Sequence, residues 1–402
     1  MADDASANDG TAGEWLLSSD SHVIEPPDLW VGRGGGLADR MPHVESAADG
    51  EWWFVDGYKT MSFLGIQTGD RFDVAPEQLR TSGTFEEVRP AAYDARRYVE
   101  ENELDGVWGS VLYPSQGLVL YNVPVSDVVS ASMQAYNDWL AEFCSEAPGR
   151  LKGIAMVNID DVDAAVVELE RCRRIGLSGA LITVAPPSWQ PYRAPVYDRF
   201  WAAAVDLDMP LSLHVATDRA DPRVGRAAYR LDVKDVPPSV FINSDFQVRQ
   251  ALAELIFSGV FERFPRLRVG SIEHELAWIP FFLARIDYTY TDRPRRGPDW
   301  HRFADPDVLP SDFFRRNVFA SFQEDPYGMR LRDVCGVHTL MWGSDYPHTE
   351  STFPRSRDIL DKIFADVPAG EAIRIASTNC AELYGFDVPP VATAEAREHI
   401  AS

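Results

Sequence analysis

The stretch SSDSHVIEPPDLW, residues 18–30, follows a short apolar run and contains two groups that bind metals or move protons. Asp20 and His22 are separated by a single serine. Side chains two positions apart on a β-strand point to the same side, so this pair would present a carboxylate and an imidazole together. A reactive site built on this pair needs partners from elsewhere in the chain.

Three further residues of this kind come at the ends of apolar, strand-like runs: His214 in PLSLHV, His274 in RLRVGSIEH and Asp345 in HTLMWGSD. Imidazole nitrogens and carboxylate oxygens are ligands that Zn²⁺ and Mn²⁺ accept. We therefore expect Asp20, His22, His214 and Asp345 to bind one divalent ion. Such an ion acidifies a bound water or polarises a substrate oxygen.

Each residue also has an ordinary structural interpretation. Asp20 and Asp345 are of a type that caps turns, and His22 and His214 are of a type that makes buried hydrogen bonds in a core. Four such groups at three strand ends are much less expected by coincidence than any one of them alone. The coincidence favours the shared metal site.

His274 lies between Glu273 and Glu275, whose charges should raise its pKa above the usual value of about 6.5. We expect it to donate or accept a proton. Glu273 is the alternative acid/base group, and an ion-paired structural histidine is the ordinary interpretation. His348 would either contact substrate or hold Asp345 in place.

Two substrate contacts are candidates in the stretch SWQPYRAPVYDRF, which follows the fourth strand-like run. Trp189 and Arg193 would line a pocket there, with ordinary packing as the alternative.

Strand-like runs alternate with segments of helical spacing along the chain, which predicts parallel strands joined by helices. The eight runs are 15–19, 106–114, 151–159, 178–184, 210–215, 266–274, 317–322 and 338–345. Eight units favour an α/β fold of the (β/α)₈ or TIM barrel type over an open sheet. In such a barrel the carboxyl ends of the strands surround one opening, so residues far apart in sequence meet there.

The chain divides into a disordered N-terminal tail, 1–13, a single barrel domain, 14–388, and a C-terminal tail, 389–402. Two insertions interrupt the barrel pattern: 31–90 after the first strand and 216–243 after the fifth. Both would lie at the reactive opening.

The first insertion contains EWWFVDGYKT, which predicts a hairpin that turns at Asp56 and Gly57. Its aromatic residues Trp52, Trp53 and Phe54 would expose apolar surface on a monomer. This favours a homodimer or higher oligomer. Coverage of the barrel's own mouth is the competing explanation.

Composition limits the partners. The net charge of −24 over 402 residues disfavours nucleic acid and acidic membranes, since both attract Lys and Arg. The four cysteines are scattered and form no CxxC motif, the N-terminus lacks a signal-peptide pattern, and no apolar run is long enough to span a membrane. We expect a cytoplasmic protein that acts on a small molecule.

The stretches DSHVIEPPDLW, LSLH, FERFPRLRVGSIEHELAWIPFFLARID and MWGSDYPHTES resemble the amidohydrolase-related (amidohydrolase 2) family, in the branch of aminocarboxymuconate-semialdehyde decarboxylase and γ-resorcylate decarboxylase. The resemblance covers most of 15–385. It implies a distorted (β/α)₈ barrel of the metal-dependent hydrolase type. It also implies that the ligand positions fall on Asp20, His22, His214 and Asp345, and that the catalytic histidine of the sixth strand falls on His274.

Two departures bear on the chemistry. Several members have histidine or glutamate where this chain has Asp20, and a harder ligand lets Mn²⁺ or Mg²⁺ compete with Zn²⁺. Decarboxylases of this branch often carry Gly-Glu after the histidine, where this chain reads Glu275-Leu276-Ala277; this argues against decarboxylation. Other relatives place only a glutamate on this strand, matching Glu273, so the acid/base assignment stays divided.

The scarcity of lysine bears on the metal count. Binuclear amidohydrolases typically bridge two metals with a carbamylated lysine at the end of the fourth strand. No lysine lies near Val184 in this sequence, which predicts one metal ion per chain.

The family resemblance favours non-oxidative decarboxylation of a small aromatic or unsaturated carboxylate. The alternative is a hydrolase of a lactone, amide or C–C bond, in which metal-activated water loses its proton to Asp345. A barrel that binds a ligand without metal is the third reading.

Overall fold

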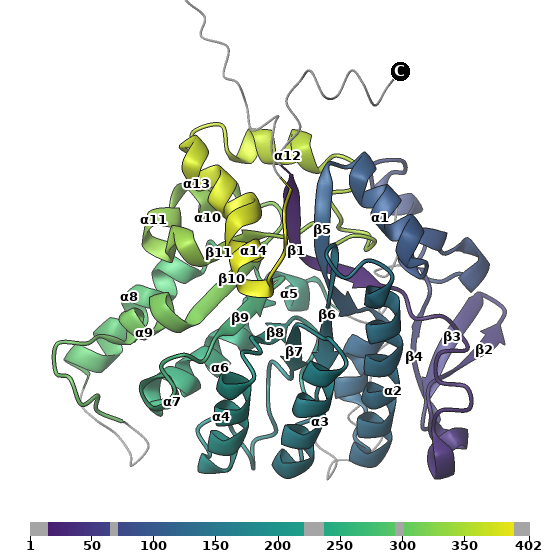
Figure 1. The fold of residues 1–402 in the computed structure, drawn as a ribbon, viewed down its shortest axis with the longest axis horizontal. Coiled ribbons are helices and arrows are strands. Elements are labelled where there is room, and N and C mark those ends of the chain that lie inside the picture. The colour runs from purple at the N-terminus through teal and green to yellow at the C-terminus, as the bar shows by residue number, and fades with distance from the viewer. Residues whose placement is uncertain (1–14, 65–70, 221–236, 294–300, 390–402) are drawn as a thin grey trace, which may run out of the picture.

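The predicted strands form one eight-stranded sheet in which every hydrogen-bonded pair is parallel (Figure 1). The computed structural model describes residues 15–64, 71–220, 237–293 and 301–389. In spatial order the strands are β1 (Leu16–Val23), β5 (Val107–Pro114), β6 (Leu151–Met156), β7 (Gly179–Ile182), β8 (Leu211–His214), β9 (Val269–Ile272), β10 (Val318–Phe322) and β11 (Leu340–Trp342).

The first and last strands of this order meet and close the barrel. The Asp345 backbone N–H donates to the Asp20 carbonyl at 2.8 Å, and the Ser344 N–H donates to the Ser18 hydroxyl at 2.8 Å. The Ser19 hydroxyl donates to the Trp342 carbonyl at 2.9 Å. The predicted (β/α)₈ barrel is therefore confirmed, and its closure places Asp20 beside Asp345.

Helices surround the barrel (Figure 1). The longest, α2, buries the stripe of residues at helical spacing that the sequence shows, and its Asn137 binds both backbone polar groups of Met156 on β6. Side chains of Asp94 and Asp161 cap the first turns of α1 and α3 by accepting backbone N–H groups. The helices are α1 (Ala95–Leu104), α2 (Ser126–Ser145), α3 (Val162–Arg174), α4 (Asp198–Asp206), α5 (Pro238–Ile242), α6 (Asp245–Phe257), α7 (Val260–Arg263), α8 (Ile279–Asp292), α9 (Pro310–Asn317), α10 (Pro326–Arg330), α11 (Arg332–Cys335), α12 (Ser356–Ile363), α13 (Ala369–Ile373) and α14 (Asn379–Tyr384).

The insertion after β1 forms a separate antiparallel sheet of β2 (His43–Ala47), β3 (Gly50–Val55) and β4 (Tyr58–Ser62). The turn between β3 and β4 is at Asp56 and Gly57, both with positive φ, as a two-residue hairpin turn requires. The sequence had indicated only two of the three strands.

The two tryptophans of this insertion are buried within the chain, and Phe54 is partly buried. Trp52 is 3% exposed and Trp53 is fully buried. Trp53 packs edge-on against Trp30, with ring centroids 5.1 Å apart. The expectation that these tryptophans expose apolar surface on a monomer is wrong, because the loop after β1 folds back to cover them.

The predicted tails 1–13 and 389–402, apart from residue 389, lie outside the described residues, as does 221–236 of the second insertion. Among the described helices, none combines the length and apolar character needed to cross a membrane.

Candidate metal centre

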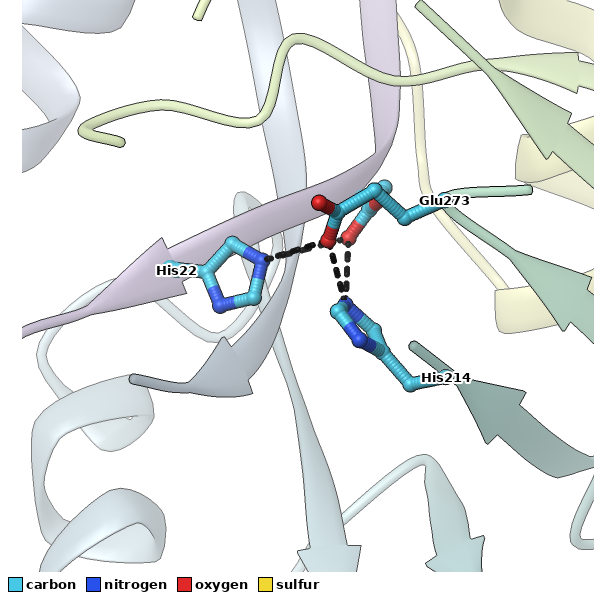
Figure 2. Close-up of side chains that lie close together, drawn as sticks. His22, His214 and Glu273 are labelled. Atoms are coloured by element: carbon cyan, nitrogen blue, oxygen red, sulfur yellow. Dashed lines mark ion pairs between the residues drawn. The ribbon is translucent and has the colours of Figure 1, made fainter. Parts of the chain in front are cut away.

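Side chains from four strand ends meet at the carboxyl end of the barrel. His22 Nε2 lies 3.6 Å from Asp20 Oδ1 and 3.2 Å from Asp345 Oδ1. His214 Nε2 lies 3.5 Å from Asp20 Oδ1 and 3.2 Å from Glu273 Oε2. Figure 2 shows the two imidazoles and the Glu273 carboxylate pointing toward one another from different strand ends. Three of the predicted ligands, Asp20, His22 and His214, are thus brought together with Glu273, and the ligand atoms of these four residues lie within 4.8 Å of one another. Asp345 groups instead with His22 and His348, so its place in the same ligand set stays a prediction.

Backbone carbonyls orient both imidazoles. His22 Nδ1 donates to the Pro114 carbonyl at 2.8 Å, and His214 Nδ1 donates to the Val215 carbonyl at 3.1 Å. Since a carbonyl only accepts, each ring carries its proton on Nδ1 and directs the Nε2 lone pair at the carboxylates. This is the tautomer that binds a metal through Nε2.

Three buried polar atoms of this cluster have no hydrogen-bond partner among the described residues: both carboxylate oxygens of Asp20 and Nε2 of His214. His22 Nε2 lies instead 3.2 Å from Asp345 Oδ1, which His348 Nδ1 approaches to 2.9 Å. Leaving buried charge unpaired costs several kcal/mol per ion, in an order-of-magnitude sense. A divalent cation would relieve the repulsion between lone pairs and carboxylates, so this set of donors fits such an ion.

The backbone is strained at two of these positions. Glu273 has φ of 61° and Asp345 has φ of 55°, in the left-handed region that side chains other than glycine rarely adopt. Such conformations occur mostly at functional sites, where the surrounding structure holds them. Each turn ends its strand and aims the carboxylate into the cluster.

The pKa values of Glu273 and Asp345 are shifted in opposite directions. Burial raises the pKa of Glu273 well above its usual range, and the charges of Asp345 and Asp20 add to the effect. Burial would also raise the pKa of Asp345, but the imidazoles of His348 and His22 outweigh it and hold that pKa low. For His22, burial works against the charged form, yet the hydrogen bond and charge of Asp345 and the charge of Asp20 raise its pKa overall.

His274 differs from the expectation. Its side chain is buried, and burial followed by the charge of His214 lowers its pKa to about 3. The predicted rise is wrong because the two flanking carboxylates point elsewhere: Glu273 faces His214, and Glu275 accepts the Gln323 backbone N–H at 3.3 Å. His274 Nδ1 contacts the Ser271 hydroxyl at 3.2 Å, and its Nε2 has no partner among the described residues.

His348 lies behind the cluster. Its ring stacks on His22 with centroids 3.8 Å apart, and its Nδ1 is 2.9 Å from Asp345 Oδ1. Its Nε2 contacts the Ser115 hydroxyl at 2.8 Å. Of the two roles considered from the sequence, this position matches the one that holds Asp345.

The pocket-lining role of the other two substrate candidates stays a prediction. Trp189 is 40% exposed. Arg193 forms an ion pair with Glu254 of α6 at 2.8 Å.

The end of β5 was missed by the sequence reasoning. Its Pro114 carbonyl and Ser115 hydroxyl orient His22 and His348. The signal was present, since the second strand-like run ends at this proline and strand ends carry the chemistry in such a barrel.

A family model described as amidohydrolase matches residues 118–386. The γ-resorcylate decarboxylase of Rhodococcus jostii is 28% identical over 266 residues, which are 62% of this chain and 75% of that protein. The crystal structure of an amidohydrolase from Mycobacterium avium subsp. paratuberculosis superposes with a TM-score of 0.74 at 20% identity, covering 92% of this chain and 99% of that one.

A second solved structure carries a ligand and a metal. It is the 5-carboxyvanillate decarboxylase of Novosphingobium aromaticivorans, complexed with manganese and 4-hydroxy-3-methoxy-5-nitrobenzoic acid. Its TM-score is 0.66 at 17% identity, and the match covers 93% of this chain and 96% of that one. The family model spans more than half of the chain, and the relatives fall in the branch indicated by the sequence motifs. This chain belongs to the amidohydrolase family.

Proposed function

We propose that this protein is a mononuclear metal-dependent enzyme that decarboxylates a small aromatic or unsaturated carboxylic acid without an oxidant. The observation that carries the proposal is the meeting of Asp20, His22 and His214, with Asp345 3.2 Å from His22; both Asp20 carboxylate oxygens and His214 Nε2 are buried and have no hydrogen-bond partner among the described residues. The similarity to γ-resorcylate decarboxylases supports this reaction over others that the same site could perform.

These four residues would hold the ion, and Mn²⁺ and Zn²⁺ suit their nitrogen and oxygen donors, with Mg²⁺ a further candidate. Manganese is bound in the 5-carboxyvanillate decarboxylase structure. When bound, the ion supplies positive charge that holds a carboxylate and an adjacent oxygen.

Glu273 is the proton donor in this proposal. Groups whose surroundings push their pKa values apart take the acid and base roles. Burial and the charges of Asp345 and Asp20 raise the pKa of Glu273, which favours its protonated form, and its side chain is 20% exposed. Asp345, with its low pKa, stays ionised. His274 stays neutral and offers its unpartnered Nε2 to the substrate, so it would orient the substrate and not protonate it.

Hydrolysis is the second candidate. An ionised Asp345 next to the cluster has the charge needed to accept a proton from water. The two reactions share a ligand set and differ in product.

The test starts from purified protein. We expect close to one Mn²⁺ or Zn²⁺ per chain by elemental analysis, and CO₂ release from hydroxylated benzoates such as 2,6-dihydroxybenzoate. Cleavage of lactones or amides without CO₂ release would replace decarboxylation by hydrolysis. Metal content near zero, with no activity after addition of either ion, would indicate a metal-free binding protein.

Cytoplasmic location and self-association are part of the proposal. All four cysteines, Cys144, Cys172, Cys335 and Cys380, are buried and unpaired, as in proteins of reducing compartments. Large apolar side chains are exposed on α8, α10 and α11, including Phe281 and Tyr327, and a homodimer or higher oligomer would cover them. Sedimentation analysis of the metal-loaded protein measures the subunit number.

A further inference from the structure

The end of β10 carries a buried amide that the proposed reaction does not use. Gln323 follows the last residue of the strand and is 7% exposed. Its Nε2 has no hydrogen-bond partner among the described residues. A buried donor left unsatisfied destabilises the fold, so its presence calls for a function.

The strand directs this side chain toward the barrel mouth. Side chains two positions apart on a strand share a face, so Gln323 lies on the same face of β10 as Ser321. The Ser321 hydroxyl contacts the Ser19 hydroxyl at 2.9 Å. A methyl group placed on Gly343 would lie 2.9 Å from that hydroxyl and 2.5 Å from the Asp20 Cβ. Ser321 and Asp20 therefore face the same space, and Gln323 is one step closer to the opening.

The segment that follows β9, which contains His274, lies beside Gln323. In the β9–β10 ladder Val318 pairs with Val269 and Ala320 with Ser271. Beyond the ladder, the Gln323 backbone N–H donates to Glu275 Oε2 at 3.3 Å, which holds Gln323 next to the residue that follows His274. His274 Nε2 also has no partner among the described residues. Two buried polar groups without hydrogen-bond partners among the described residues thus follow the ends of two adjacent strands, β9 and β10.

Acidic side chains close to Gln323 in this region are engaged elsewhere. Glu275 accepts the backbone N–H groups of Gln323 and Glu324, each at 3.3 Å. Asp325 accepts the N–H groups of Leu276 at 2.8 Å and Ala277 at 2.7 Å. Glu324 pairs with Arg71. The Gln323 amide is therefore a neutral donor that these carboxylates do not occupy, and its complement is an acceptor oxygen on a ligand.

We propose that Gln323 is a specificity-determining residue, which donates a hydrogen bond to a second oxygen substituent of the substrate while the carboxylate lies at the metal centre. The inference rests on the proposed function for the placement of the carboxylate. It narrows the substrate class to acids that carry an additional acceptor oxygen, such as a phenolic oxygen, on the side of β9 and β10.

The test measures binding by calorimetry on manganese-loaded protein. The probes are 2-hydroxybenzoate and the four dihydroxybenzoates that add a second ring hydroxyl to it at carbon 3, 4, 5 or 6. In the wild type we expect one isomer to bind at least about tenfold more tightly than the parent acid, since a satisfied buried donor is worth about that factor. Gln323→Leu should reduce this gain to within about twofold, because the amide is gone.

Gln134→Leu, the same change at an exposed position of α2, is the matched control and should keep the gain. Gln323→Met keeps the length of the side chain and removes the amide without adding a new acceptor, so it should also reduce the gain to within about twofold. Melting temperature and manganese stoichiometry establish that each variant is folded and loaded.

Three outcomes would overturn the inference: no binding of any of these acids by the wild type, equal affinities for all of them, or a gain that survives both substitutions of Gln323. The proposed function is judged separately by CO₂ release. Selective binding without CO₂ release would remove decarboxylation and leave the role of Gln323 intact. CO₂ release combined with equal affinities for all of the acids would support decarboxylation and exclude the specificity role of Gln323.

Discussion

Two backbone carbonyls determine what the histidines of the metal centre present to the barrel mouth. Pro114 and Val215 each accept the Nδ1 proton of a ring, at His22 and His214. Both rings then face carboxylates through a lone pair. Without an ion this arrangement attracts a proton, which is why the pKa of His22 rises although burial opposes its charge. A metal ion and a proton therefore compete for the same Nε2 lone pair.

Substitution of Glu273 separates the ligand role from the acid role. Glu273→Gln keeps the shape of the side chain and removes its ionisable proton, while Asp20, His22, His214 and Asp345 are untouched. We expect metal content close to that of the wild type and decarboxylation slower by about 10²–10⁴, the usual contribution of a general acid. Elemental analysis and initial rates on the same preparation give both quantities.

His22→Ala is the comparison for this experiment, and it should lose the metal together with the activity. Loss of metal from Glu273→Gln would identify Glu273 as a ligand instead. Unchanged turnover would exclude it as the acid, and the same measurement on His274→Ala would then decide whether His274 takes that role.

At the scale of elements, the carboxyl ends of the strands explain why the sequence located most of the site. Asp20, His22, His214 and Asp345 each end an apolar run, and a closed barrel brings such ends to one opening. The order of the strands and the closure of the barrel follow from the presence of eight strand–helix units.

The approach of Glu273 to His214 depends on a backbone angle that no pattern records. A φ of 61° at Glu273 breaks the alternation of the strand, and the carboxylate lies 3.2 Å from His214 Nε2. Which of Glu273 and His274 is the acid/base group stays a prediction. The burial of Trp53 could not be seen either, because its partner Trp30 lies in the loop after β1, whose path depends on tertiary packing.

Glu25 connects the segment after β1 to the segment after β5, and its titration should make the stability of the fold depend on pH. Its carboxylate is fully buried and accepts the backbone N–H groups of Gln116 at 2.9 Å and Gly117 at 2.8 Å, just beyond β5. Burial raises its pKa from 4.5 to about 7, against the effect of these hydrogen bonds. The folded protein therefore binds a proton that the unfolded chain has already released.

A raised carboxyl pKa stabilises the fold below the unfolded value, and this contribution is lost as the pH rises through the folded value. For Glu25 the window runs from pH 4.5 to about 7. The difference corresponds to about 3 kcal/mol of unfolding free energy. In urea denaturation of metal-free protein, we expect the wild type to lose stability relative to Glu25→Gln across this window and to run parallel to it above.

Glu142→Gln, at an exposed position of α2, provides the control and should follow the wild type at every pH. A constant difference between the wild type and Glu25→Gln would show that Glu25 is ionised throughout.

On the scale of the whole molecule, the metal centre links strands from opposite ends of the chain. Asp20 and His22 come from the first strand and Asp345 from the turn after the last, so an ion held between them spans the closure of the barrel. A ligand that binds only the folded state adds stability in proportion to the logarithm of its concentration. Metal binding should therefore raise the free energy of unfolding of the whole barrel.

We expect Mn²⁺ added to chelator-treated protein to raise the unfolding free energy by about 2.7 kcal/mol when its free concentration is one hundred times its dissociation constant.

The stabilisation by Mn²⁺ should weaken at acid pH. Protonated His22 stabilises the metal-free fold fully below its unfolded pKa of 6.5, and this contribution is lost as the pH rises through the raised folded value. Metal binding must displace that proton, so the melting-temperature shift caused by Mn²⁺ should be larger at pH 8 than at pH 6. His22→Ala should show no shift at either pH. Equal shifts at the two pH values in the wild type would mean that the ion binds without displacing a proton, and that His22 is not its ligand.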